Sequence, residues 1–371
     1  MNKKINLIIC AVIFASNYIL AQNFKPWGKE DSLEVCSNYS LDLAVNNCGI
    51  SFGNSKNFNG LRFNTVDCGI ENINGINFTF WTPRQNSGSV INGLAIGLAP
   101  EAATINGLSF GLASVISEQS ANGITIGGLA VVSQGSLTGI QFGSLAVVSQ
   151  KKVRGINVGG LAVVVPNGEA TGINIAGLAT VGNGGIKGIN IGGLALVSQN
   201  GISGVNVSGL ATVAAKGTIK GLNAGGLALV GNEGISGINI GGLAIVSNKY
   251  IKGINIAGLA VVSGNEGSIS GINISLGAIQ SENSVKGLSI TGYKIKTNFL
   301  QGLNVSGIMS IADNARGITV SCYNEYVNQS GLCIGLLNLA DVLKGIQIGL
   351  INVVKNNPAP FRVLPLINFH L

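Results

Sequence analysis

A unit of the form Gly-Ile-Asn-Ile-Gly-Gly-Leu-Ala recurs about every sixteen residues through most of this 371-residue sequence. In the central block, from Gly123 to Gly271, the glycines that open successive units lie 16 to 18 residues apart. Degenerate copies extend the array upstream to Gly60 and downstream to Gly345, which makes nineteen units. A fixed period of this length is typical of stacked architectures, in which each unit buries its apolar side chains against its neighbours.

Each unit reads as two short β-strands joined by a bend. In the unit that opens at Gly155, residues 156–158 alternate apolar and polar side chains, and a Gly-Gly pair follows as the bend. Residues 161–164 are again rich in β-branched side chains. An interior glycine costs a helix about 1 kcal/mol, and the 56 glycines of this chain leave no helical period intact. The sequence therefore predicts an all-β fold.

Comparison of the units, position by position, predicts which side chains are buried. The Leu161 and Val164 positions do not vary across the central units, so we expect them in a shared core. The Val163 position takes threonine in some units, so we expect it to be partly exposed. The column of asparagines needs a separate reason, because asparagine is unfavourable in strands. Stacked about 4.8 Å apart, the side-chain amides would form a hydrogen-bonded ladder. This column comprises Asn157, Asn174, Asn190, Asn206, Asn223, Asn239, Asn255 and Asn273.

These columns favour a repetitive β-solenoid with one or two units per coil. The residue before the opening glycine alternates, however, because Arg154 and Lys187 occupy every second unit, with Thr171 between them. A two-unit period also fits an up-and-down antiparallel outer-membrane β-barrel, whose successive strands begin at opposite ends. The repeats lack aromatic girdles, and neither face of a straight strand through the unit suits a polar lumen. The solenoid is therefore the first hypothesis, and the barrel is the alternative.

Four segments are distinguished along the chain. Residues 1–22 are predicted to be a signal peptide, because two lysines precede an apolar run that is too short to span a bilayer. The polar segment 23–58 is expected to be an N-terminal cap or arm, 59–354 the β-repeat array, and 355–371 a C-terminal cap or tail. The signal peptide predicts export, to the outer membrane or cell surface rather than the periplasm.

Residues that carry catalysis or bind metals are scarce. The only histidine is His370, so a catalytic triad would lack its proton carrier and a zinc site would lack ligands. The net charge of +7 is dispersed, without the clustered basic stripe that is typical of nucleic-acid binding. We therefore expect no enzymatic activity, no cofactor and no nucleic-acid partner.

Cysteine usage permits disulfides in an exported protein. Five cysteines follow the predicted signal peptide, so at least one of them cannot pair within the chain. Proximity in sequence favours the pairs Cys36–Cys48 and Cys322–Cys333, which leaves Cys68 free.

The C-terminal tail carries a resemblance to a known family. It reads Gly-Ile-Gln-Ile-Gly-Leu-Ile-Asn at 345–352, Asn-Pro at 357–358 and Leu-Pro-Leu-Ile-Asn at 364–368. Together with the Gly-Ile-x-Ile-Gly-Gly-Leu array, this tail resembles that of a widespread family of exported bacterial surface-repeat proteins. The resemblance covers nearly all of the chain after the signal peptide and implies a surface or envelope role. It brings no activity and no catalytic residues, and the chain departs from the family by ending on Leu371 instead of an aromatic residue.

The sequence thus favours a structural or interaction protein of the bacterial cell envelope that presents a rigid repeat surface. Its columns of Asn, Ser, Thr and Lys would face another protein, an envelope component or a glycan. One unit per coil would give a rod of roughly 90 Å, and two units per coil would halve that length. An outer-membrane pore or passive channel is the alternative function.

Overall fold

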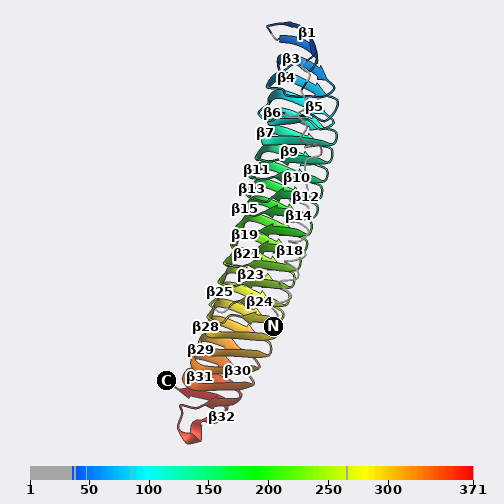
Figure 1. The fold of residues 1–371 in the computed structure, drawn as a ribbon. Coiled ribbons are helices and arrows are strands. Elements are labelled where there is room, and N and C mark those ends of the chain that lie inside the picture. Colours follow the sequence, from blue (N-terminus) through cyan, green and yellow to red (C-terminus); the bar gives the residue numbers. More distant parts are fainter. Residues whose placement is uncertain (1–35, 37–38, 47, 85, 265, 371) are drawn as a thin grey trace. The chain divides into compact units, whose positions relative to one another are not determined.

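The computed structural model describes residues 36, 39–46, 48–84, 86–264 and 266–370, and residues 39–370 form one β-solenoid of about 18 turns (Figure 1). The strands stack along a single axis, so the solenoid is a rod. Among the described residues, the only helical element is the 3₁₀ turn η1 (Ala359–Phe361). The predicted signal peptide lies outside the described residues.

The strands fall into four groups along the chain. The first coils contain β1 (Ser40–Val45), β2 (Cys48–Gly53), β3 (Asn57–Asn64), β4 (Asn72–Thr79), β5 (Val90–Gly97), β6 (Glu101–Gly111) and β7 (Ser114–Gly127). The long strands of the central coils are β9 (Ser136–Gly143), β11 (Lys152–Gly159), β13 (Glu169–Ala176), β15 (Gly185–Gly192), β17 (Gly201–Ser208), β19 (Thr218–Gly225), β21 (Gly234–Gly241), β23 (Tyr250–Ala257), β25 (Ser268–Ser275) and β27 (Ser284–Thr291). The short strands between them are β8 (Ala130–Ser133), β10 (Ala146–Ser149), β12 (Ala162–Val165), β14 (Ala179–Gly182), β16 (Ala195–Ser198), β18 (Ala211–Ala214), β20 (Ala228–Gly231), β22 (Ala244–Ser247), β24 (Ala260–Ser263) and β26 (Ala278–Gln280). The last coils contain β28 (Lys294–Ser306), β29 (Met309–Val320), β30 (Tyr323–Ile334), β31 (Leu337–Val354) and β32 (Val363–His370).

Neighbouring units pair in parallel, one coil apart. Strand β11 pairs with β9 and β13, and β12 pairs with β10 and β14. Each coil therefore holds one repeat unit, and both the two-unit coil and the up-and-down antiparallel alternative are wrong. The alternation that suggested them fits the parallel register, in which Arg154 lies beside Thr138 and Thr171. Like charges thus stand two coils, or about 9.6 Å, apart.

Each long strand bends at its opening glycine. Gly155 has a φ of +113°, and a Cβ added to it would lie 2.0 Å from the carbonyl oxygen of Gly139 in the coil before. From Gly60 to Gly345, every glycine of this column has a φ between 106° and 144°. Only glycine adopts such a backbone without strain. The column therefore turns the chain around the axis and lets the stacked backbones come close.

The core consists of the inward side chains of these strands. Val153 and Val163 have no exposed surface, and neither has Asn157, which lies between them in the coil. The burial expected from the sequence was wrong at three positions. Leu161 is 45 % exposed and Val164 is only half-buried, whereas Val163, expected to be partly exposed, is fully buried. The reason is the two-residue alternation of β12, which points Val163 inward and its neighbour outward. The invariant Leu161 and Val164 positions are thus on the surface, whereas the variable Val163 position lies in the core.

Antiparallel strands occupy both ends of the array. Strand β1 pairs antiparallel with β2, and β32 pairs antiparallel with β31. All the pairs between β2 and β31 are parallel. The two antiparallel strands fall in the segments expected to be caps, 23–58 and 355–371. They end the run of parallel repeat strands at both ends of the array, so the outermost strands are not themselves repeat units.

Candidate interaction surface

The predicted asparagine column forms a continuous ladder inside the coils. From Asn157 to Asn273, each Nδ2 donates a hydrogen bond to the Oδ1 of the asparagine in the next coil, at 2.7–2.9 Å. All eight side chains are buried. The ladder therefore ties the coils together, and the expectation that these asparagines face a partner is wrong.

The same inward column carries a buried ion pair near the N-terminal end. Arg62 forms a salt bridge with Asp67 and donates a hydrogen bond of 2.7 Å to Asn77 Oδ1. Burial raises the pKa of the Asp67 carboxyl, but the Arg62 charge and the hydrogen bonds from Thr79, Arg62 and Asn64 outweigh it, so that the pKa lies below its ordinary value. The two charged side chains are 0 % and 1 % exposed. This pair links β3 to β4 and has no access to a substrate.

A second ladder, not expected from the sequence, runs along the surface of the first coils. The side-chain amides are joined at 2.7–2.9 Å, each Nδ2 donating to the Oδ1 in the coil before. The ladder comprises Asn59, Asn74, Asn92, Asn106 and Asn122. Each of these residues precedes an opening glycine. The alignment of the opening glycines in the degenerate units already places these asparagines in one column, so the signal for this ladder is present in the sequence.

The cysteines do not form the locally expected pairs. Cys48, Cys322 and Cys333 carry free thiols. Cys36 and Cys68 are each part of a disulfide, so the expectation that Cys68 is free is wrong. Cys322 is exposed, but Cys333 faces the interior in the column of Asn157, so their Cβ atoms point apart. Burial raises the pKa of the Cys333 thiol to about 12. That thiol is therefore protonated at neutral pH and is a poor nucleophile.

The remaining groups that could carry chemistry are dispersed. His370 lies in the C-terminal cap, where its Nδ1 is 2.5 Å from Asn357 Oδ1. Within the described ranges, no group of three or more His, Cys, Asp or Glu side chains converges to hold a metal ion. No helix in the described part of the chain is long and apolar enough to cross a membrane.

The outward side chains after the glycine bend form an unbroken apolar face. The Ile156 and Val158 positions carry only aliphatic residues or phenylalanine in twenty strands in register, and none of these side chains is buried. The Leu161 position adds a third column in the central coils. We call these three columns the apolar face. The first column is Ile50, Leu61, Ile76, Leu94, Leu108, Ile124, Ile140, Ile156, Ile173, Ile189, Val205, Leu222, Ile238, Ile254, Ile272, Leu288, Leu303, Ile318, Leu332 and Ile346. The second is Phe52, Phe63, Phe78, Ile96, Phe110, Ile126, Phe142, Val158, Ile175, Ile191, Val207, Ala224, Ile240, Ile256, Ile274, Ile290, Val305, Val320, Ile334 and Ile348. The third is Leu129, Leu145, Leu161, Leu178, Leu194, Leu210, Leu227, Leu243 and Leu259.

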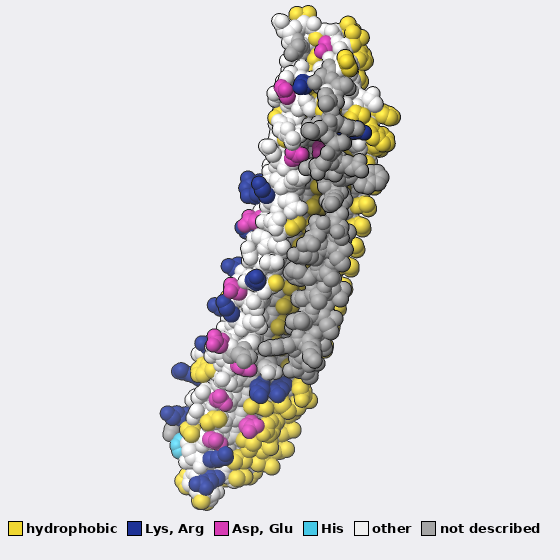
Figure 2. Space-filling view, in the orientation of Figure 1, with side chains coloured by type: hydrophobic (Ala, Val, Ile, Leu, Met, Phe, Trp, Pro, Cys, Tyr) yellow, Lys and Arg dark blue, Asp and Glu magenta, His cyan; other side chains and the backbone are white. Residues whose placement is uncertain are grey.

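Charged side chains are absent from the apolar face and gather elsewhere on the coil. Figure 2 shows lysine and arginine side chains along one edge of the rod and hydrophobic side chains along the opposite edge. Some of the charged side chains are paired: Lys187 with Glu169 at 2.8 Å, and Lys249 with Glu233 at 3.0 Å. These pairs are largely solvated and add little stability. The rod is thus amphipathic around its circumference.

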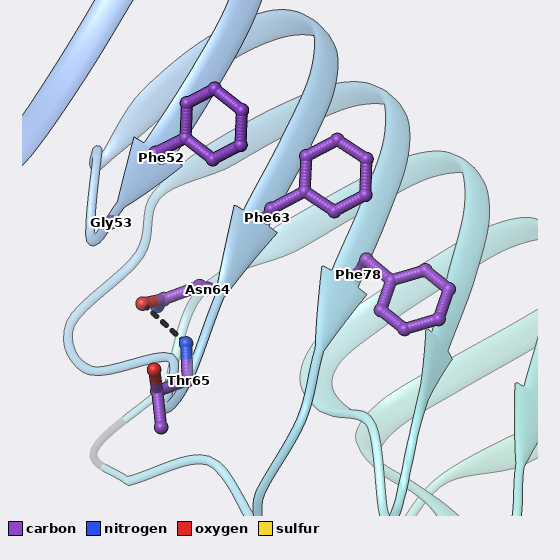
Figure 3. A pocket seen from close by; sticks show the side chains of 6 residues that line it. All are labelled: Phe52, Gly53, Phe63, Asn64, Thr65 and Phe78. Atoms are coloured by element: carbon purple, nitrogen blue, oxygen red, sulfur yellow. Dashed lines mark hydrogen bonds between the residues drawn. The ribbon is translucent and has the colours of Figure 1, made fainter.

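The N-terminal end of the apolar face is aromatic. The rings of Phe52 and Phe63 stack with their centroids 5.6 Å apart, and the Phe78 ring follows at 6.0 Å (Figure 3). Beside these rings lies a shallow hollow of about 360 Å³, which Asn64 and Thr65 also line. Its lining residues include no titratable side chain. The hollow therefore suits an apolar group better than a substrate that needs acid or base catalysis.

The size of the apolar face exceeds what a free surface usually shows. Twenty strands spaced about 4.8 Å apart give a length of about 90 Å. Two columns give a width of about 10 Å, and the third column widens the central coils to about 15 Å. The largest apolar patch on a typical monomer is roughly 300–600 Å², and larger ones mark interaction sites. Sheet faces of this composition are normally covered by a second layer. The geometry therefore identifies the apolar face as the candidate site for binding.

Comparison of the chain with protein-family models, with curated proteins and with solved structures gave no match.

Proposed function

We propose that this chain is a non-enzymatic structural or interaction protein of the bacterial cell envelope, and that it binds through its apolar face. The observation that carries the proposal is the unbroken run of aliphatic and phenylalanine side chains over twenty strands in register. A rigid parallel stack holds these side chains at fixed spacing, so a partner meets a preformed surface and little conformational entropy is lost on binding.

Two further features support the proposal. The first twenty-two residues have the sequence pattern of a signal peptide, which favours export. The buried groups that could act in catalysis have structural partners, since Asp67 is paired with Arg62 and the Cys333 thiol donates to Asn338. The surface, by contrast, offers a continuous apolar area, which suits binding and not chemistry.

Envelope retention tests the proposal. Cells that export the chain would be fractionated, and the share of the chain in the envelope would be compared between two triple variants. The first, I191K/I240K/I256K, places charges on the apolar face, where these side chains are 38–47 % exposed. The control, S203K/S236K/S270K, places the same charges in the column that already alternates with lysine.

We expect the first variant to leave the envelope fraction and the control to remain with it. Equal retention of both variants, or a chain that keeps its N-terminal leader in the cytoplasm, would contradict the proposal.

A further inference from the structure

We infer that the partner of the apolar face is a second copy of this chain, packed face to face and antiparallel about a two-fold axis. The inference rests on the proposed function, because it names the occupant of the same surface. It is carried by the area of the face, by its repeat spacing and by the distribution of large side chains along it.

The area matches that of a stable dimer. A face about 10 Å wide over about 90 Å, widened to about 15 Å where the third column lies, removes roughly 1,100 Å² from solvent on each copy, or about 2,200 Å² in total. Interfaces of obligate homodimers start near 2,000 Å² and are rich in apolar side chains. No position of the apolar face carries a charge. Face-to-face packing would therefore bury no unpaired ion.

The apolar faces of two copies have the same repeat spacing. Both faces repeat at the strand separation of about 4.8 Å, so rows of side chains from one copy fit between the rows of the other along the whole length. Packed sheets lie about 10 Å apart, with their inner side chains interdigitated. A partner with a different period would lose this fit after a few coils.

The side-chain sizes favour the antiparallel order. All five phenylalanines of the second column lie in its first seven strands, the last of them being Phe142 in β9. The other end of this column has smaller side chains, among them Val305 and Val320. An antiparallel pair in full overlap places Phe78 opposite Val320 of the other copy, so that large faces small. A parallel pair would set phenylalanine against phenylalanine and leave a gap at the far end.

The ends of the face complement each other in the same arrangement. Phe369 in β32 lies in register with Ile346 and continues the first column, with 60 % of its surface exposed. In the antiparallel dimer it comes to the end of the partner that carries the hollow beside Phe52 and Phe63 (Figure 3). A two-fold interface is also closed, so it produces dimers and no open filament.

The two-fold axis falls between β15 and β17, next to Ile191. A lysine at position 191 would lie opposite the same lysine of the second copy, displaced along the rod by about one strand spacing. Ile191 is 40 % exposed in the single chain, so the coil itself tolerates the substitution. The matched control is S203K, which adds the same charge in the polar column between Lys187 and Lys220.

Sedimentation equilibrium of the exported chain in detergent-free buffer tests the dimer. We expect twice the single-chain mass for the wild type and for S203K, and a dissociation constant at least roughly 100-fold higher for I191K. A monomeric wild type, an open polymer, or equal dissociation constants for I191K and S203K would overturn the inference.

Spin labels test the order of the two chains. With Cys48 and Cys322 replaced by serine, a label at S330C near the C-terminal end should give a separation of about 80 Å between copies. A separation below about 40 Å would indicate parallel chains and overturn the antiparallel order.

Vesicles of phosphatidylethanolamine and phosphatidylglycerol separate this inference from the proposed function. If the wild type is monomeric and floats with the vesicles while I191K does not, a lipid surface is the partner. The dimer is then overturned, and the proposed function stands. If I191K and S203K behave alike in sedimentation, flotation and envelope retention, both proposals fail.

Discussion

At the scale of single residues, the opening glycines decide how closely the coils stack. Gly204 has a φ of +111°, and a Cβ there would lie 2.0 Å from the Gly188 carbonyl oxygen. We expect G204A to lower the free energy of unfolding by at least about 2 kcal/mol, because both the backbone and the contact are strained. The control is G264A, because Gly264 is not among the glycines with positive φ and an added Cβ would lie no closer than 3.2 Å to its neighbours. Chemical denaturation of both variants checks this, and an equal loss would contradict it.

The asparagine ladder gives a second residue-scale prediction. Asn206 accepts from Asn190 and donates to Asn223, each at 2.7 Å. N206A leaves the buried Asn223 Oδ1 without its donor and Asn190 Nδ2 with only a longer bond of 3.4 Å to the Gly188 carbonyl oxygen, so we expect a loss of about 1–3 kcal/mol in unfolding free energy. Asn167 makes an exposed hydrogen bond to Gln150, and N167A should change the unfolding free energy by less than about 0.5 kcal/mol. Similar losses in both variants would show that the ladder adds nothing to stability.

Single positions also show where sequence reasoning succeeds and where it fails. The asparagine ladder was predictable, because only stacking explains asparagine at the same place in successive strands. The exposure of Leu161 was not, because invariance within a repeat was interpreted as burial. Position 163 tolerates Val, Leu, Ile and Thr because neighbouring coils can compensate for a change of volume inside the core. The Leu161 column on the surface cannot vary in size in the same way if a partner with the same repeat spacing covers it.

At the scale of elements, β3 and β4 depend on the buried pair of Arg62 and Asp67. The pKa of Asp67 is lowered in the folded chain, so its stabilising effect is fully present above the unfolded value of 3.8. That effect is lost as the pH falls through the lower folded pKa. D67N leaves the buried Arg62 charge without a counter-charge, and we expect it to destabilise these strands by about 3–5 kcal/mol at neutral pH.

Hydrogen exchange of β3 and β4 measures this effect, because coils of a solenoid can open separately. The difference between wild type and D67N should be large at pH 7 and should shrink well below pH 3.8, where the wild-type carboxyl is also protonated. E169Q removes only a solvated pair and serves as the control. A difference that does not change with pH would contradict the assigned role.

The way the strands pair explains why the disulfides expected from the sequence were wrong. Cys322 and Cys333 are eleven residues apart, but they occupy opposite sides of the sheet, one exposed and one buried. Sequence distance says little in a coil, where residues sixteen apart are neighbours and residues eight apart lie on different sides. The register that brings Arg62 beside Asn77 follows from the alignment of Gly60 with Gly75, but the position of Asp67 does not, because Asp67 lies in the loop between β3 and β4.

At the scale of the whole array, each coil contacts only the coils before and after it. Deletion of residues 188–220 removes two units and rejoins Lys187 to Gly221, which keeps both the strand register and the alternation of lysine. We expect this variant to fold, with a denaturant m-value about one-tenth smaller, because m scales with the buried surface. Deletion of residues 188–195 removes half a coil and should abolish cooperative unfolding. Loss of folding in both variants would show that the coils are not independent units.

The antiparallel strands at both ends have a consequence for length. Between β1 and β32 the number of coils is fixed, and the array is closed at each end by a strand that runs antiparallel to its neighbour. The number of repeats encoded in the gene therefore sets the length of the rod, and each repeat that is gained or lost changes that length by about 4.8 Å. Duplication or loss of a repeat by recombination would change the span of the rod in steps, while its cross-section stays the same.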